Sequence, residues 1–269
     1  CITVMLGILS AAIYAENESG DSFIGLMYHQ VLKDESRAGK YIITPGELEN
    51  DLAYLSENGY VSVLPSQLVK IREQGGRLPE KTVVITFDDG YETGLYYVLP
   101  LLKKYGMKAV INVVGSYTDE YSRINEEGKH LSYAYLTWNE IKKLSDSGYV
   151  EIGNHTYNMH SNNVERNGCA RKENESDEQY RTVLYEDVAR LSDKLQRVTG
   201  KRPVAFAYPF GSLSEGSAEI IGSAGISVFM TCCEQPCSMN RNGRIVINRY
   251  NRESGRSAQQ ICEEFNNAF

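Results

Sequence analysis

Residues 82–90 read Thr-Val-Val-Ile-Thr-Phe-Asp-Asp-Gly, an apolar run rich in β-branched residues that stops at two carboxylates and a glycine. A run without polar alternation is typical of a strand covered on both faces, and such strands belong to parallel α/β sheets with active sites beyond their carboxyl ends. Neighbouring strand side chains point to opposite faces, so Asp88 and Asp89 can serve one site only where the chain turns, as Gly90 allows. One acid could then bind a metal while the other moves a proton. A helix N-cap followed by a solvated acid would explain the pair equally well.

Apolar runs alternate with amphipathic segments along the chain. The predicted strands cover residues 23–28, 61–64, 82–87, 108–114, 149–153, 204–208, 226–231 and 244–248. The predicted helices cover residues 45–58, 66–74, 92–105, 138–147, 177–199, 217–223 and 257–269. This alternation predicts parallel strands in a closed or nearly closed barrel. We expect the polar segments 117–136 and 158–178 to be long loops that wall a substrate groove.

The totals are compatible with a single globular domain. A length of 269 residues allows one α/β barrel or two smaller domains, and no linker is visible, so we expect one catalytic domain over residues 22–269. The net charge of -7 argues against nucleic acid or an anionic membrane as the main partner. The 19 tyrosines would suit sugar faces, although most of them are expected at ordinary core edges.

The first 21 residues stand apart from this pattern. Residues 1–15 are apolar and residues 16–21 are polar, which predicts the remnant of a signal peptide or of a membrane anchor, followed by a linker. Either alternative places the domain outside the cytoplasm, in the extracellular space or at the cell surface. Peripheral or anchored association with a membrane is compatible with both.

The cysteines give a weaker signal. Cys232, Cys233 and Cys237 lack the paired spacing of a zinc ribbon. A disulfide from Cys233 or Cys237 to an unassigned cysteine is the expectation for an exported protein.

The histidines point to a metal site. His155 and His160 are five residues apart, which would place them about 140° apart on a helix, so they can share an ion only if the backbone between them forms a loop. With Asp89 they would form a set of two imidazoles and one carboxylate that suits Zn²⁺ or a similar divalent ion. The alternative is a pair of surface histidines that never meet.

Three motifs together resemble a known family. They are Thr-Phe-Asp-Asp-Gly at residues 86–90, Gly-Asn-His-Thr at 153–156 with His160, and Ala-Tyr-Pro-Phe-Gly at 207–211. In this order they resemble the first three motifs of the polysaccharide deacetylase (NodB-homology) family of carbohydrate esterases, over about residues 23–250. Residues 26–31, Leu-Met-Tyr-His-Gln-Val, resemble the poly-N-acetylglucosamine deacetylase branch, in which the motif with the catalytic acid precedes the first motif.

The resemblance implies a fold and a set of roles. The implied fold is a distorted (β/α) barrel of about seven parallel strands. Asp89, His155 and His160 would hold the divalent ion, with Zn²⁺ preferred and Co²⁺ or Ni²⁺ also compatible. Asp88 would be the base and His29 the acid. The backbone N–H of Phe210 would stabilise the oxyanion, and Tyr208, Pro209, Tyr157 and Arg249 are the candidates for the substrate groove.

Two departures from the family pattern bear on these roles. No histidine follows His160, so the usual C-terminal acid is absent and His29 must replace it. Ala207 stands where many members have an arginine that pairs with the base, which leaves that support to Arg249 or Arg202.

The expected function is therefore metal-dependent removal of N-acetyl groups from an N-acetylglucosamine-containing polysaccharide, either an exopolysaccharide or peptidoglycan. The alternatives are a catalytically silent barrel that binds glycans and a related amide hydrolase that acts on a small substrate.

Overall fold

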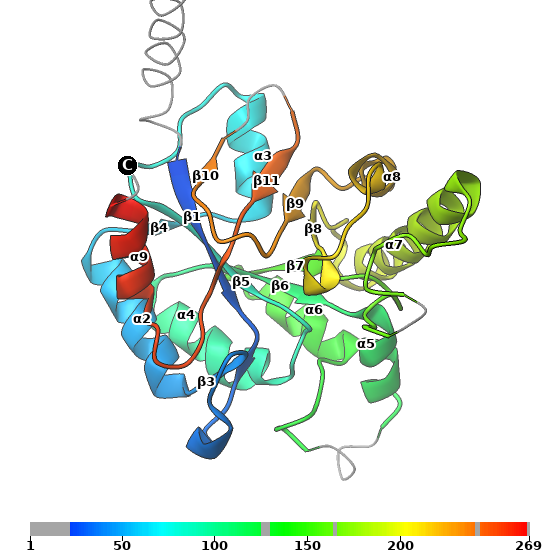
Figure 1. The fold of residues 1–269 in the computed structure, drawn as a ribbon. Coiled ribbons are helices and arrows are strands. Elements are labelled where there is room, and N and C mark those ends of the chain that lie inside the picture. The colour runs from blue at the N-terminus through cyan, green and yellow to red at the C-terminus, as the bar shows by residue number, and fades with distance from the viewer. Residues whose placement is uncertain (1–21, 125–129, 164–165, 240–242, 268–269) are drawn as a thin grey trace, which may run out of the picture.

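The structure is a computed structural model that describes residues 22–124, 130–163, 166–239 and 243–267. The predicted leader or anchor at residues 1–21 lies outside these ranges. Figure 1 shows a sheet that curves round on itself, with helices packed along its outside. Within the described residues no helix is both long enough and apolar enough to cross a membrane.

The sheet is a nearly closed barrel built mainly from parallel strands. Seven parallel strands are hydrogen-bonded in the order β1 (Ser22–Tyr28), β5 (Thr82–Phe87), β6 (Ala109–Val113), β7 (Val150–Asn154), β8 (Ala205–Ala207), β9 (Val228–Met230) and β11 (Ile245–Ile247). β12 (Tyr250–Asn251) follows β11 directly and pairs in parallel with β1, so the last strand segment joins both edges. The predicted barrel of about seven parallel strands is confirmed.

Short strands complete the sheets. β4 (Val61–Ser62) adds in parallel to β5, and β10 (Cys237–Ser238) adds antiparallel to β1. β2 (Gln30–Val31) and β3 (Ile42–Ile43) form a separate ribbon directly after β1. The sequence did not reveal this ribbon, β10 or β12, because two-residue strands show no hydrophobic period.

The helices follow local start and stop signals. They are α2 (Pro45–Glu57), α3 (Pro65–Glu73), α4 (Leu99–Tyr105), α5 (Gly115–Tyr121), α6 (Trp138–Asp146), α7 (Asp177–Thr199), α8 (Ser217–Ser223) and α9 (Ala258–Asn267). Two short 3-10 helices, η1 (Glu35–Arg37) and η4 (Pro209–Gly211), and one π-helical turn, η2 (Gly94–Val98), complete the set. Thr44, Thr137 and Ser176 each close a capping box at the start of a helix. Gly106 and Gly200 end α4 and α7 in the left-handed conformation.

One predicted loop is partly helical. Residues 115–121, mostly inside the expected loop 117–136, form α5. The buried face of α5 consists of Gly115 and Thr118, so this helix lacks the apolar stripe that sequence reasoning uses.

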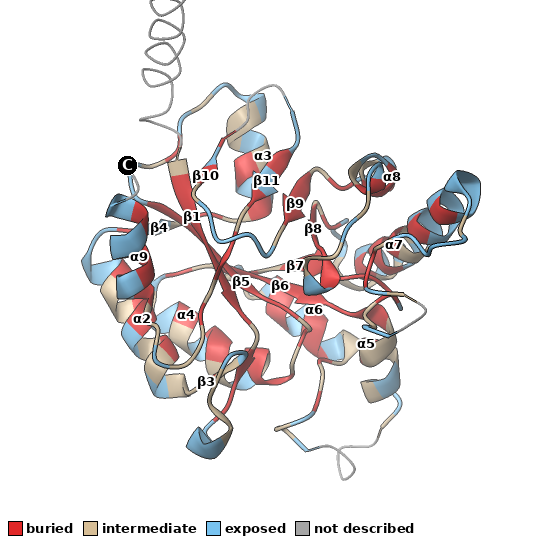
Figure 2. Cartoon of the chain, viewed as in Figure 1, coloured by how far each residue is buried: buried red, intermediate tan, exposed pale blue. Residues whose placement is uncertain are grey.

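The core lies on both faces of the sheet. Every residue of β5 and β6 is buried, as expected for strands covered on both sides (Figure 2).

The described cysteines, 169, 232, 233, 237 and 262, are all free, so the expected disulfide at Cys233 or Cys237 is wrong for any pair among them.

Candidate active site

The predicted site residues follow the carboxyl ends of neighbouring strands. His29 follows β1, Asp88 and Asp89 follow β5, His155 follows β7, and η4 with Phe210 lies beyond β8. In parallel strands these ends meet at one edge of the barrel (Figure 1). Strands that are far apart in the sequence therefore deliver polar side chains to a common place.

Three of these side chains converge. The Nε2 atoms of His160 and His155 lie 3.0 and 3.5 Å from Oδ1 of Asp89. Ligand atoms at about 2.0–2.1 Å from a tetrahedral Zn²⁺ lie roughly 3.3 Å from one another, so this donor set fits a divalent ion in size and in chemistry. Nδ1 of His155 lies 2.8 Å from the carbonyl oxygen of Ala207, and Nδ1 of His160 lies 3.3 Å from the hydroxyl of Tyr117. These partners orient both rings with Nε2 toward Asp89.

Unusual backbone conformations produce this convergence. Among the described residues, Asp89, Thr156 and Phe210 are the non-glycine residues with positive φ, at 70°, 72° and 58°. Each such residue costs about 1–3 kcal/mol and persists only where its surroundings enforce it. Asp89 and Phe210 line the cavity of the site, and Thr156 directly follows the candidate ligand His155. Gly90 also has a positive φ of 72°, and a Cβ there would lie 2.9 Å from Cγ1 of Val113. The turn required for both acids to serve one site is therefore present.

Asp88 is held as a buried carboxylate. Its Oδ1 accepts hydrogen bonds from Nδ2 of Asn112 at 2.7 Å and from Nη1 of Arg249 at 2.8 Å. Burial is the largest influence and opposes ionisation, but the charge and hydrogen bond of Arg249 together with the neighbouring imidazoles outweigh it and hold the pKa of Asp88 well below its usual value. Across the described part of the chain no hydrogen bond ends on Oδ2, so that oxygen can meet another partner.

Arg249 is part of this support and not of the groove. Its side chain is 0% exposed, so the prediction that it lines the substrate groove is wrong. Arg202, the other candidate, pairs instead with Asp193 at 2.7 Å. Arg249 thus reaches Asp88 from the closing strand segment, in a protein that has Ala207 at the position of the usual arginine.

Sequence reasoning missed Asn112. It is a fully buried residue of β6 and the second donor to Asp88. The available signal was a single amide inside the otherwise apolar strand Ala-Val-Ile-Asn-Val.

His29 borders the same cavity as both acids. Its Nδ1 is buried and has no hydrogen-bond partner among the described residues, and its ring centroid lies 4.7 Å from that of Tyr41. Burial lowers the pKa of His29 below its ordinary value, against the opposing charges of Asp89 and Asp88. A buried nitrogen that has no hydrogen-bond partner and lies beside two carboxylates is typical of a group that binds a ligand or takes part in catalysis.

The cavity has a volume of about 550 Å³. It is lined by Met27, His29, Lys40, Tyr41, Asp88, Asp89, Tyr91, His155, His160, Asn162, Tyr208, Phe210, Cys232, Glu234 and Asn251. Tyr208 is in this set, as expected for the groove, whereas Pro209 is buried and is not among the lining residues, so the prediction for Pro209 is wrong. Phe210 is 48% exposed, and its ring centroid lies 4.6 Å from that of His160.

Tyr157 is not in this cavity. It lines a second one on the other side of the 155–160 loop, where its hydroxyl donates to Asp119 at 2.6 Å. The prediction that Tyr157 belongs to the same groove as the metal site is therefore wrong. The left-handed turn at Thr156 directs the following side chain away from the histidines.

The fold and the site together define the class of this protein. The family model described as polysaccharide deacetylase matches residues 75–229, and the chain belongs to this family. The matched segment contains Asp88, Asp89, His155, His160 and Phe210, but neither His29 nor Arg249.

Particular relatives narrow the comparison. The chain is 26% identical over 230 residues to a poly-beta-1,6-N-acetyl-D-glucosamine N-deacetylase of Escherichia coli K12, covering 78% of this chain and 34% of the relative. It therefore spans about a third of the length of that relative. A protein of the same name from Staphylococcus aureus MRSA252 is 22% identical over 241 residues, covering 85% of this chain and 77% of that one.

Solved structures agree with the fold. A de-N-acetylase from Aggregatibacter actinomycetemcomitans superposes with a TM-score of 0.76 at 26% identity, covering 90% of this chain and 99% of that one. IcaB from Ammonifex degensii superposes with a TM-score of 0.71 at 25% identity, covering 91% and 97%.

Proposed function

We propose that this chain is a metal-dependent N-deacetylase that removes acetyl groups from an N-acetylglucosamine-containing polysaccharide. The observation that carries the proposal is the meeting of Asp89, His155 and His160 in a cavity that Asp88 and His29 also border. Three candidate ligands, a carboxylate held ionised and an imidazole are the parts that hydrolysis of an unactivated amide requires.

The metal in this proposal is held by Asp89, His155 and His160. Two imidazoles and one carboxylate match Zn²⁺ best, and Co²⁺ or Ni²⁺ are also compatible with this donor set. A bound divalent ion supplies Lewis-acid polarisation of the acetamide carbonyl and lowers the pKa of water toward about 7.

Asp88 accepts the proton of the attacking water. The charge of Arg249 keeps this carboxylate ionised, and Oδ2 is the oxygen that is not engaged by Arg249 or Asn112. The low pKa makes Asp88 a weaker base, because it reduces the affinity of the carboxylate for the proton. The same low pKa keeps Asp88 ionised, and so able to accept a proton, throughout the neutral pH range.

His29 donates a proton to the departing amine, and the backbone N–H of Phe210 faces the developing oxyanion. Because burial lowers the pKa of His29, its ring takes up a proton from solvent less readily and, once protonated, releases that proton to the amine more readily. A backbone donor at an oxyanion is worth about 3 kcal/mol by precedent, provided that it is fixed in advance. The left-handed backbone at Phe210 supports such a fixed orientation.

The substrate is proposed to be a polymer, because the cavity is open and bordered by exposed rings. Tyr41 and Phe210 are 50% and 48% exposed, and flat aromatic rings pack well on sugar faces. Two relatives are named as poly-beta-1,6-N-acetyl-D-glucosamine N-deacetylases, which supports an exopolysaccharide over peptidoglycan. Action on such a polymer places the domain in the extracellular space or at the cell surface, where peripheral or anchored membrane association is compatible with the proposal.

The test is an assay of released acetate. The protein is chelated, reloaded separately with Zn²⁺, Co²⁺ or Ni²⁺, and incubated with β-1,6-linked N-acetylglucosamine oligomers, chito-oligosaccharides, peptidoglycan fragments and a small N-acetylated amide. We expect metal-dependent acetate release, greatest on the β-1,6-linked oligomers. Oligomer binding without acetate release under every metal would instead support a silent glycan-binding barrel, and release from the small amide alone would support a small-substrate hydrolase.

A further inference from the structure

The loop between His155 and His160 is held by individual hydrogen bonds and not by regular secondary structure. The backbone N–H groups of Gly115 and Ser116, at the start of α5, donate to the carbonyl oxygens of Thr156 and Tyr157 at 3.1 and 2.7 Å. β7 ends at Asn154, and residues 155–160 lie outside the helices and strands. Within the loop, Asn154 Oδ1 accepts from the backbone N–H of Thr156 at 2.9 Å, and Thr156 Oγ1 accepts from the N–H of Met159 at 3.2 Å. These two bonds join the loop only to itself.

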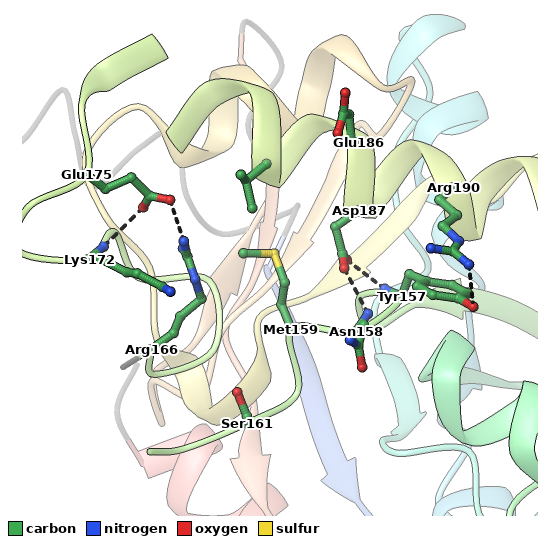
Figure 3. Close-up of a pocket in the computed structure, with 11 residues that line it drawn as sticks. Tyr157, Asn158, Met159, Ser161, Arg166, Lys172, Glu175, Glu186, Asp187 and Arg190 are labelled. Atoms are coloured by element: carbon green, nitrogen blue, oxygen red, sulfur yellow. Dashed lines mark hydrogen bonds and ion pairs between the residues drawn. The ribbon is translucent and has the colours of Figure 1, made fainter. Parts of the chain in front are cut away.

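The two central amides of the loop are bound by one residue from another element. Asp187 of α7 accepts the N–H of Tyr157 on Oδ1 at 2.6 Å and the N–H of Asn158 on Oδ2 at 2.8 Å (Figure 3). Hydrogen bonds to a carboxylate are roughly twice as strong as neutral ones. Both oxygens are used, so the carboxylate fixes the direction of the loop as well as its distance from α7.

The loop lies between two cavities at this point. One side carries His155 and His160, which face the site cavity. The other side faces a second cavity of about 510 Å³, lined by Tyr157, Asn158, Met159, Ser161, Arg166, Lys172, Glu175, Val183, Glu186, Asp187 and Arg190 (Figure 3). Tyr157 and Met159 pack into the hydrophobic core, whereas Asn158 between them is exposed. The two bonds to Asp187 therefore hold the loop backbone beside its most exposed residue.

Side-chain contacts hold α7 against its neighbours in the two turns that follow Asp187. One turn further along, Arg190 lies 3.6 Å from the Tyr157 ring centroid and donates to its hydroxyl at 2.8 Å. A turn after that, Lys194 pairs at 2.7 Å with Asp119, which also accepts from the Tyr157 hydroxyl. The helix face that carries Asp187 is thereby locked to the loop and to α5.

We propose that Asp187 is a positioning residue that sets the place of His160 relative to Asp89 and His155. The inference rests on the proposed metal site, because it concerns how that site is held in shape. Asp187 touches neither the candidate ligands nor the cavity where the chemistry is proposed, so its effect passes through the loop backbone alone. Residues that orient metal ligands from behind typically contribute about 10–100-fold to metal affinity.

The test compares Asp187→Asn with Asp193→Asn, the same change on an exposed residue of the same helix. In Asp187→Asn one carbonyl still accepts an amide, whereas the new NH₂ group faces the second N–H. We expect the Kd for Zn²⁺, measured by competition with a chelator, to rise about 10–100-fold in Asp187→Asn and to stay unchanged in Asp193→Asn. In the metal-free protein, the amides of Tyr157 and Asn158 should exchange hydrogen faster in Asp187→Asn alone.

Two further variants separate the outcomes. His160→Ala should lose Zn²⁺ binding; if it binds as the wild type does, the proposed metal site is wrong. If His160→Ala loses Zn²⁺ while Asp187→Asn keeps the wild-type Kd, only the inference about Asp187 is overturned, and any loss of stability in that variant is merely structural. If Asp187→Asn does not fold, Asp187→Glu replaces it in the test, because this variant displaces the carboxylate while keeping its charge. The same rise in the Kd for Zn²⁺ is expected in Asp187→Glu. A wild-type Kd in that variant overturns the inference.

Discussion

Each end of β7 has a buried carboxylate nearby, and the surroundings shift the pKa values of these two carboxylates in opposite directions. Glu151, at the N-terminal end, gives Oε2 to the N–H and hydroxyl of Ser66, while Oε1 is buried without a partner among the described residues. Burial raises the pKa of Glu151. At the other end, Arg249 and the neighbouring imidazoles together overcome the effect of burial and keep the pKa of Asp88 well below its usual value.

The difference shows that the negative charge of Asp88, at the carboxyl end of the barrel, depends on the groups that surround it. Removing a carboxylate from water favours its neutral form unless a cation or several donors compensate. Asp88 accepts from a fully buried guanidinium and from an amide on one oxygen. The hydrogen bonds to Glu151 come from one serine, and together with the charge of Lys201 they do not offset its burial. The four predictions that follow test this contrast.

The largest effect should come from neutralising the carboxylate at the active end. Asp88→Asn is expected to lower the rate of acetate release about 10²–10⁴-fold, because the amide cannot accept the proton of water. Glu151→Gln makes the same change at the other end and should leave the rate unaltered. An equal loss in both variants, or in neither, would show that the two ends do not differ in the proposed way.

Removal of the buried cation should lower the stability of the fold. Arg249→Met leaves Asp88 as an uncompensated buried charge, and breaking such a pair costs about 3–5 kcal/mol in the free energy of unfolding. Arg202→Met breaks the partly exposed pair with Asp193 and should cost only about 0–1 kcal/mol. Urea unfolding of the metal-free variants measures both, and similar small losses would mean that Arg249 does not stabilise Asp88.

A smaller loss of stability is expected from a substitution in β7 beside Asn112, the second donor to Asp88. A Cβ at Gly153 would lie 2.0 Å from Oδ1 of Asn112, so Gly153→Ala must displace that amide from its place beside Asp88. Overpacking of this kind costs about 1–3 kcal/mol. Gly46→Ala, where the nearest atom is 3.9 Å away, is the control and should not destabilise the fold. The account of Asn112 fails if the two substitutions have equal effects on unfolding.

The smallest effect concerns pH at the N-terminal end. Because burial raises the pKa of folded Glu151 above its unfolded value, its stabilising contribution is complete below the unfolded pKa and is lost as pH rises through the folded pKa. Glu151→Gln does not titrate, so it should gain stability relative to the wild type as pH rises through that range. A difference in unfolding free energy that stays constant from acid to neutral pH would contradict the raised pKa.

Most of the fold could be predicted from the sequence, because each main strand is an apolar run and each long helix has a cap and a stop. The clustering of His29, Asp88, Asp89, His155 and His160 also followed from the motifs and from the rule that parallel strand ends meet. Sequence alone could not choose between Arg249 and Arg202 as the partner of Asp88. That choice depends on how the segment after β11 crosses back to β1, and the contact joins residues 161 positions apart.

Two other features also depend on tertiary geometry. Tyr157 lies between two predicted ligands, yet the left-handed turn at Thr156 sends it to the second cavity. Asp187 lies on a charged helix where an acid usually means a solvated face, and only the structure shows that it binds two loop amides.

The most direct test of the central claim is a crystal structure of the Zn²⁺-loaded protein with anomalous diffraction at the zinc edge. The account predicts an anomalous peak at about 2.0–2.2 Å from a carboxylate oxygen of Asp89 and from Nε2 of both His155 and His160. Zinc that is bound elsewhere, or that leaves any one of these three side chains out of its coordination, would contradict it.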